Sequence, residues 1–161
     1  MEIVLGDEMG FCQGVRRALE MAEQAVQRGE TVRTLGDIVH NPRVVERLQG
    51  LGVEVAAGLD QVGPGETAMV TAHGAPPQLF SEAERRGIPV LDGTCPLTKQ
   101  VQRLAQEMAE AGYGVLICGD PEHAEVRGTL GYAGAGAVAG RTLEEVGEYA
   151  AHRGLALPWK A

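Results

Sequence analysis

The sequence has no uninterrupted apolar run of about 18 residues, the length that a membrane-spanning helix requires. Its first residues, Met1-Glu2-Ile3-Val4, also lack the basic region and the apolar core of a secretory signal peptide. These two absences lead us to expect a cytoplasmic protein with neither a signal peptide nor a membrane span.

Basic residues are also fewer than acidic ones. Lys and Arg together number 14 against 22 Asp and Glu, and the formal net charge at pH 7 is −8. An acidic chain without a run of basic residues is poorly suited to bind nucleic acid or a membrane surface. Any anionic substrate must therefore be held by a local site rather than by the overall field of the molecule.

Cysteine is scarce. Cys12, Cys95 and Cys118 are an odd number of cysteines and lie far apart in the chain, which argues against a framework of disulfides. No C-x-x-C pair is present, so a zinc ribbon is not supported. Cys12 and Cys95, isolated on separate turns, suit instead an iron–sulfur cluster assembled between two lobes.

The sequence does have the composition of a globular protein, with 161 residues of which 44% are hydrophobic and 22% charged. Short apolar runs at residues 3–5, 32–35, 53–56, 68–71, 89–91, 113–117 and 135–139 alternate with helix-like segments at residues 15–28, 43–49, 78–86, 97–111 and 143–152. This alternation predicts an α/β fold with parallel sheets and crossover helices. We expect two similar lobes, residues 1–95 and 96–161 with Cys95 at their boundary, packed around a cavity at the C-terminal ends of the strands.

Cys12 lies between two glycines, Gly10 and Gly14, at a turn from a strand into a helix. Free backbone N–H groups and the positive end of the helix favour the thiolate there, which is the form that binds a metal or a cluster. A small cysteine that merely packs in the core is the alternative. Cys95 is followed by a proline at a helix start and has a similar setting, whereas Cys118 ends an apolar strand and favours a buried structural thiol.

Three of the four histidines follow expected strands: His40, His73 and His123, the last with Glu125 two residues on. Ligands of open parallel sheets bind at the carboxyl ends of the strands, so we expect these side chains to converge on one cavity and to bind phosphate oxygens. The alternatives are a backbone contact at a helix start for His40 and an acid–base pair on a helix surface for His123 and Glu125, although their spacing suits a turn or an extended piece. His152, on a polar helix face, is expected to be solvated.

The stretch Gly10-Phe11-Cys12-Gln13-Gly14-Val15-Arg16-Arg17-Ala18 resembles the N-terminal signature of the LytB family, the 4-hydroxy-3-methylbut-2-enyl diphosphate reductases. Four further motifs follow in the order of that family: Ile38-Val39-His40-Asn41-Pro42, Ala72-His73-Gly74, Asp92-Gly93-Thr94-Cys95-Pro96-Leu97-Thr98-Lys99 and His123-Ala124-Glu125-Val126-Arg127-Gly128-Thr129. The similarity runs from Ile3 to about Glu145.

The resemblance implies three similar α/β lobes around a central cavity, each giving one cysteine to a [4Fe–4S] cluster whose fourth iron stays open for substrate. It implies an enzyme of non-mevalonate isoprenoid biosynthesis that uses two electrons, from a donor such as ferredoxin or flavodoxin, to remove the allylic hydroxyl and yield isopentenyl and dimethylallyl diphosphate. Carried over by position, the cluster ligands would be Cys12 and Cys95, the diphosphate would be held by His40, His73 and His123, and Glu125 would feed protons to the leaving hydroxyl.

The chain also departs from the family pattern. Family members are about twice as long, and their third cysteine and the serine, asparagine and threonine of the substrate site belong to a part that this chain lacks. Cys118 does not align with that third cysteine, Ala124 replaces a usual proline, and Gly93 stands where alanine is common. We therefore expect a shortened form without the third lobe. Its function is either that of the reductase or that of a non-catalytic diphosphate-binding remnant without a stable cluster, with a non-redox binding domain for small diphosphates as a distant third.

Overall fold

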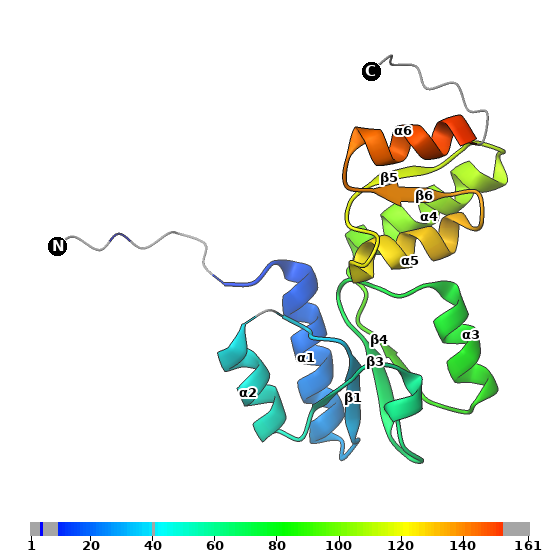
Figure 1. Cartoon of the computed structure of the whole chain (residues 1–161). Coiled ribbons are helices and arrows are strands. Elements are labelled where there is room, and N and C mark those ends of the chain that lie inside the picture. The colour runs from blue at the N-terminus through cyan, green and yellow to red at the C-terminus, as the bar shows by residue number, and fades with distance from the viewer. Residues whose placement is uncertain (1–3, 5–9, 40, 153–161) are drawn as a thin grey trace.

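The computed structural model describes residues 4, 10–39 and 41–152 (Figure 1). The elements in chain order are α1 (Gln13–Gln27), β1 (Val32–Leu35), α2 (Pro42–Gly50), β2 (Glu54–Ala56), the short 3-10 helix η1 (Leu59–Gln61), β3 (Thr67–Val70), α3 (Pro77–Arg85), β4 (Val90–Asp92), α4 (Pro96–Glu110), β5 (Leu116–Cys118), α5 (Ala124–Ala133), β6 (Val138–Gly140) and α6 (Leu143–His152). Residues 3 and 5 of the expected first strand, and His40, lie outside the described residues.

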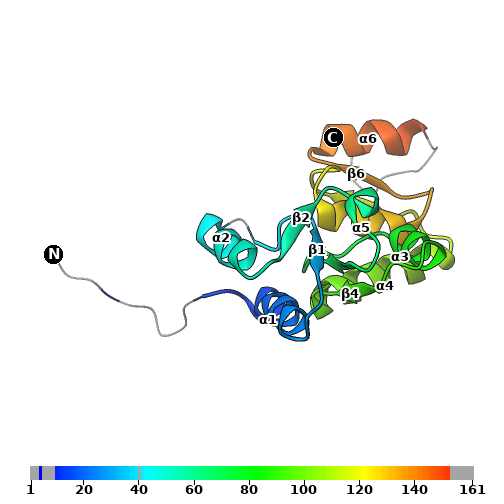
Figure 2. The ribbon, with the colours of Figure 1, turned by 90° about the horizontal axis from the view of Figure 1, so that it is seen from below.

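The first sheet has four parallel strands in the order β2-β1-β3-β4. Helices α1 and α2 cover one face of this sheet and α3 covers the other, as two perpendicular views show (Figures 1 and 2). All four residues of β3 are buried, which is typical of a central parallel strand covered on both faces. Met69, fully buried, packs with Ala18 and Ala22 of α1 in the larger of the two hydrophobic clusters.

The second sheet has two parallel strands, β5 and β6. Helices α4 and α5 lie on the side of this sheet that faces the first sheet, and α6 lies on the opposite side (Figure 1). The α/β class with parallel sheets is confirmed, and the helices and strands expected within the described residues are present with shifted ends. No helix in the described part of the chain combines the length and the apolar character needed to cross a membrane.

Helix α5 was not expected, because its sequence carries glycines and lacks an apolar stripe. The structure shows why both glycines of α5 are there. A Cβ atom at Gly131 would overlap Pro76, and one at Gly128 would lie 2.8 Å from Nε2 of Gln102. The glycines therefore allow α5 to pack closely against α4 and the start of α3, a role that a pattern of helical periodicity cannot reveal.

Candidate functional site

Cys12 and Cys95 occupy the same position in the fold, immediately before a helix. Each is the N-cap residue of a 15-residue helix, α1 and α4 respectively, and neither side chain makes a capping hydrogen bond. Cys12 is exposed and Cys95 is partly buried. Both thiols therefore lie at the positive end of a helix and are not used for capping, which is a setting suited to a thiolate ligand.

The two cysteine-bearing turns lie against each other. A Cβ atom at Gly14, two residues after Cys12, would come within 2.5 Å of the Cys95 sulfur, so only glycine fits there. A guanidinium nitrogen of Arg17 in α1 also donates to the carbonyl oxygen of Thr94 at 3.2 Å. Because these contacts join the start of α1 to the start of α4, Cys12 and Cys95 belong to the same region at the carboxyl end of the first sheet.

Asp92 and Lys99 fix the turn that leads into Cys95, and sequence reasoning assigned neither of them a role. An Asp92 carboxylate oxygen accepts hydrogen bonds from the backbone N–H of Thr94, at 3.0 Å, and from its hydroxyl, and the other oxygen pairs with Lys99. Burial raises the pKa of Asp92, but the hydrogen bonds from Lys99 and Thr94 outweigh it and hold the pKa below its usual range. The signal in the sequence was a carboxylate two residues before a threonine, a pattern typical of a side-chain-capped turn.

His73, His123 and Glu125 come together from two elements. The His73 ring, in the loop after β3, meets the His123 ring edge-on at a centroid distance of 5.2 Å. A Glu125 carboxylate oxygen lies 3.9 Å from Nδ1 of His73. The structure thus brings three predicted site residues into one cluster, and the fourth, His40, lies outside the described residues.

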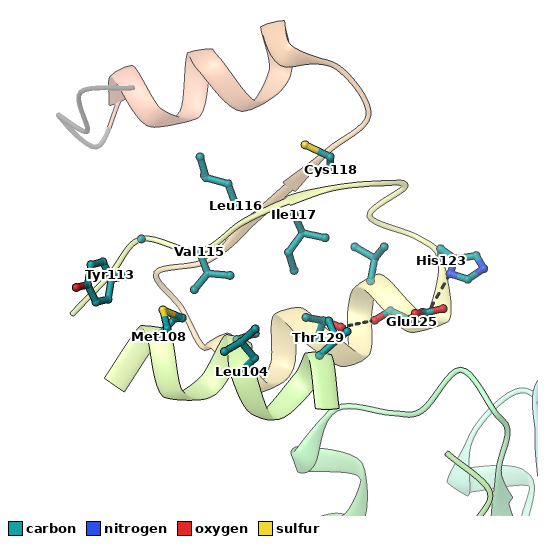
Figure 3. Close-up of a pocket in the computed structure, with 14 residues that line it drawn as sticks. Leu104, Met108, Tyr113, Val115, Leu116, Ile117, Cys118, His123, Glu125 and Thr129 are labelled. Carbon is teal, nitrogen blue, oxygen red and sulfur yellow. Dashed lines mark hydrogen bonds between the residues drawn. The ribbon is translucent and has the colours of Figure 1, made fainter. Parts of the chain in front are cut away.

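The backbone contacts of α5 orient His123. Its Nδ1 accepts a hydrogen bond of 3.3 Å from the backbone N–H of Glu125, as an N-cap side chain does (Figure 3). A ring nitrogen that accepts a hydrogen bond carries no proton, so the proton of the neutral ring is on Nε2. Nε2 can therefore donate to an anion. His123 and Glu125 prove to lie at a helix start, and not in the turn or extended piece that their spacing suggested.

The cluster borders a cavity of about 550 Å³ between the loop after β3 and the start of α5. Its lining includes Thr71, His73, His123 and Arg127. Arg127 adds one positive charge to this cavity, whose lining also carries the carboxylates of Asp37 and Glu122. Arg127 was missed as a site residue, although it lies four residues, about one helical turn, after His123. An imidazole pair beside a guanidinium is a chemistry suited to phosphate oxygens.

Gln102 lies behind the cluster and is only 3% exposed. Its Nε2 has no hydrogen-bond partner among the described residues. Added Cβ atoms at Gly74 and Gly128 would come within 2.6 Å and 2.8 Å of that nitrogen. Gln102 of α4 therefore packs directly between the His73 loop and α5, the two segments that carry the cluster.

Cys118 is exposed at the end of β5, so the expectation of a buried structural thiol is wrong. It lies with Leu116 on the side of β5 that faces α6, whereas Val115 and Ile117 point toward α4 and α5 (Figure 3). The described residues hold no group of three or more His, Cys, Asp or Glu side chains placed to bind a metal ion. They therefore provide two thiols at helix starts, not the three that the resemblance implies for a [4Fe–4S] cluster.

Parallel α/β sheets with thiols, imidazoles and a carboxylate beyond their strand ends place the chain in the open-sheet α/β class, whose ligands bind at the carboxyl ends of the strands. Comparison with known proteins is more specific. The family described as LytB protein matches residues 3–157, and the chain belongs to this family.

Relatives with established names agree. The 4-hydroxy-3-methylbut-2-enyl diphosphate reductase of Geobacter metallireducens is 43% identical over 133 residues, which are 83% of this chain and 47% of that protein. The reductase of the same name from Aquifex aeolicus is 38% identical over 157 residues, covering 94% of this chain and 54% of that protein. The chain spans about half the length of the curated relatives that it matches.

Solved structures show the same partial match. One, described as (E)-4-hydroxy-3-methyl-but-2-enyl diphosphate reductase, the terminal enzyme of the non-mevalonate pathway, is 37% identical with a TM-score of 0.78, over 91% of this chain and 53% of that chain. The reductase from Plasmodium falciparum is 29% identical with a TM-score of 0.83, over 94% of this chain and 46% of that one. The fold is therefore part of the fold of these enzymes.

Proposed function

We propose that this chain forms part of the active site of a cytoplasmic 4-hydroxy-3-methylbut-2-enyl diphosphate reductase. The observation that carries the proposal is the meeting of His73, His123 and Glu125, with the two rings 5.2 Å apart and the carboxylate 3.9 Å from His73. In this proposal the two histidines, together with His40, hold the diphosphate of the substrate, and Glu125 acts on its hydroxyl.

The proposed chemistry is a reductive dehydroxylation. The allylic C–O bond breaks, the oxygen leaves as water, and two electrons and two protons are taken up to give isopentenyl or dimethylallyl diphosphate. Glu125, half-exposed at the start of α5, would deliver the proton that makes the hydroxyl a leaving group. Nε2 of His123 would donate a hydrogen bond to a phosphate oxygen, and Arg127 would balance its charge.

Cys12 and Cys95 would be two of the thiolate ligands of a [4Fe–4S] cluster, which supplies the two electrons when bound. The third cysteine of the sequence is exposed on the α6 side of β5, so we propose that the remaining ligand comes from polypeptide outside these 161 residues. An electron carrier such as ferredoxin or flavodoxin would reduce the complete site.

We also propose the division into lobes that the sequence suggests. Residues 1–95 would contribute Cys12, His40 and His73, and residues 96–161 would contribute His123 and Glu125, with Cys95 at the boundary. The two separate sheets of the described residues support this division. The substrate site would then form between the lobes rather than within one of them.

The second candidate is a diphosphate-binding protein without a stable cluster. The observation that favours it is the pair of thiols at helix starts, beside which the described part of the chain places no third thiol. Both candidates require the histidine site. Only the reductase would turn over substrate once the missing cluster ligand is supplied.

Titration with inorganic pyrophosphate, followed by calorimetry, tests the site that both candidates share. We expect the double variant His73→Asn, His123→Asn to bind pyrophosphate at least about tenfold more weakly, because two hydrogen bonds to a charged group are lost. Glu125→Gln, the matched control, removes a negative charge beside the anion and should bind it no more weakly than the unmodified chain does. Equal affinity in the double variant and the unmodified chain would rule the site out.

A further inference from the structure

A cavity of about 260 Å³ lies between α3, α4, α5 and the end of β4. Helix α4 forms most of its wall, and the other elements contribute single side chains or a turn. The residues that line it are Phe80, Asp92, Thr94, Lys99, Gln102, Arg103, Gln106 and Tyr132. None of them lines the cavity beside His73 and His123, so the two cavities are separate.

The polar groups in this lining are mostly hydrogen-bond donors. Lys99 and Arg103 carry positive charges, and the glutamine amides and the hydroxyl of Tyr132 can also donate. Asp92 is the one carboxylate among the described residues that line the cavity, and Lys99 and Thr94 already bind it. In a chain of formal charge −8, a lining with more cations than carboxylates is a local setting suited to an anion.

Arg103 has donors to spare. Its Nε lies 3.4 Å from a carboxylate oxygen of Glu107, one helical turn further on, and both side chains are exposed, at 73% and 57%. An exposed ion pair of this kind contributes little to stability. Because a guanidinium carries five N–H donors in a planar fork, Arg103 can bind a phosphate group with two parallel hydrogen bonds at little cost to the fold.

Gln102 supplies an independent observation. Among the described residues its Nε2 is the one buried side-chain nitrogen or oxygen atom without a hydrogen-bond partner, and the residue is only 3% exposed. A buried donor without a partner lowers the stability of the fold. Such groups are rare in folded proteins and often belong to a site whose ligand is absent. Gln102 lines the cavity between Lys99 and Arg103 and the other helices, so the missing partner is expected there.

The amide of Gln102 can present its N–H groups to the cavity by a small movement. Nε2 now lies against Gly74 and Gly128, which do not line the cavity, although Gln102 does. The last torsion of a glutamine side chain is broad and roughly two-fold, so a half-turn of the amide exchanges Nε2 with Oε1. This half-turn moves the N–H groups away from the glycines, toward the side on which Gln102 lines the cavity.

We propose that this cavity binds a small anion that carries a phosphate group, held by the guanidinium of Arg103, the ammonium of Lys99 and the amide of Gln102. The cavity is smaller than the range of about 300–1,000 Å³ that is typical of sites for drug-sized ligands. Its occupant is therefore inorganic phosphate or a small phosphate ester. The rings of Phe80 and Tyr132 would contact the organic part of an ester.

The bound anion would connect elements that carry the candidate active site. Thr94 and Lys99 lie on either side of Cys95 in sequence, and Tyr132 belongs to α5, which begins after His123. An anion held between them would stabilise the packing of α4 against α5 without contacting the histidine cluster. The proposal requires neither substrate at that cluster nor bound iron, so its failure and that of the proposed function can be told apart.

Nuclear magnetic resonance of the isotope-labelled chain tests the proposal, with His73→Asn and His123→Asn present so that phosphate at the histidine cluster does not contribute. We expect inorganic phosphate to shift the side-chain amide signals of Gln102 and the backbone amide signals of residues 99–106 in a saturable way. Glycerol 3-phosphate is the second probe. Tighter binding of this ester would identify an ester as the occupant, and equal or weaker binding would identify free phosphate. The absence of a saturable shift at these residues with both probes would overturn the proposal.

Two variants assign the binding to the named side chains. Arg103→Gln should weaken phosphate binding at least about tenfold, because it removes the charged hydrogen bonds. Arg47→Gln is the matched control, since Arg47 is also an exposed arginine with one carboxylate partner, Glu23, and lies outside the cavity. Equal weakening in the two variants would show that only the overall charge matters and would overturn the proposal.

Gln102→Met separates binding from folding. It should also weaken phosphate binding about tenfold, because it removes a donor to a charged group. Its melting temperature without phosphate should be no lower than that of the unmodified chain, since no hydrogen bond among the described residues is lost. Unchanged affinity for phosphate in this variant would overturn the assignment of Gln102 to the site.

Discussion

At the scale of single residues, Asp92 stabilises the turn before Cys95 only while it is ionised, because it accepts hydrogen bonds from Thr94 and Lys99. The folded pKa lies below the unfolded value of about 3.9, so the unfolded chain binds a proton more readily than the folded one. The stabilisation is therefore complete above the unfolded pKa and is lost as the pH falls through the folded pKa.

We predict that Asp92→Asn lowers the melting temperature at pH 7 and that this difference shrinks below about pH 4, as the carboxyl of the unmodified protein takes up its proton. Thermal unfolding, followed by circular dichroism at pH values from about 2 to 7, measures this difference in melting temperature. Glu20→Gln, on the exposed side of α1, is the control and should show no such dependence. A difference between Asp92→Asn and the unmodified protein that stays constant down to pH 2 would contradict the role of the charge.

Gln102 permits a second prediction for a single residue. Its buried amide nitrogen has no partner among the described residues, so folding removes it from water without compensation. Gln102→Met keeps the length of the side chain and removes the polar atoms, and we expect it to raise the free energy of unfolding by about 1 kcal/mol. Urea denaturation measures the change, and a loss of stability would show that the amide has a partner after all.

At the scale of elements, α5 sets two physical effects against each other. Replacing glycine by alanine inside a helix ordinarily stabilises it by about 1 kcal/mol. At Gly131 the added Cβ would overlap the rigid ring of Pro76, so the structure opposes this gain. Overpacking of this kind costs about 1–3 kcal/mol, which exceeds the gain in helix propensity.

We therefore predict that Gly131→Ala destabilises the protein and that Gly147→Ala in α6 does not. Nothing lies within 4 Å of a Cβ atom at Gly147, so the propensity gain should be realised there. Urea denaturation of the two variants compares the same chemical change in two helices. Stabilisation by Gly131→Ala would mean that α5 does not pack against Pro76 as the structure shows.

The same helix marks the limit of what the sequence could predict. Apolar runs and helical periodicity predicted the α/β class, because those patterns arise from burial within one element. They could not predict α5, whose glycines are explained by contacts with residues far away in the chain, Pro76 and Gln102. The exposure of Cys118 was missed for a similar reason, since the burial of a strand end depends on neighbouring strands that the sequence pattern does not specify.

At the scale of the whole molecule, the site depends on how its parts are assembled. His73 and His123 could each be predicted from their place after a strand, but their ring distance of 5.2 Å could not, because it depends on tertiary packing such as the close approach of Gly74 and Gly128 to Gln102. The apolar face of α4 is the opposite case. The sequence predicted the helix at residues 97–111 but assigned no partner to its apolar face, and in the described structure Leu97 and Val101 on that face are exposed.

The last prediction concerns whether the 161 residues alone can hold a stable cluster. We expect the 161-residue chain, reconstituted anaerobically with iron and sulfide, to hold a [4Fe–4S] cluster weakly or not at all and to show little turnover with a chemical reductant. Two thiols stand at the starts of α1 and α4, and a cluster held by two ligands leaves a second iron open to water and oxygen. Visible absorption, together with iron and acid-labile sulfide counted per chain, is the measurement. Cys118→Ala should change nothing, whereas Cys12→Ala should abolish the residual absorption. A stable cluster with rapid turnover that is lost in Cys118→Ala would show that this exposed cysteine reaches the site, and the proposal of a ligand from outside the chain would then be wrong.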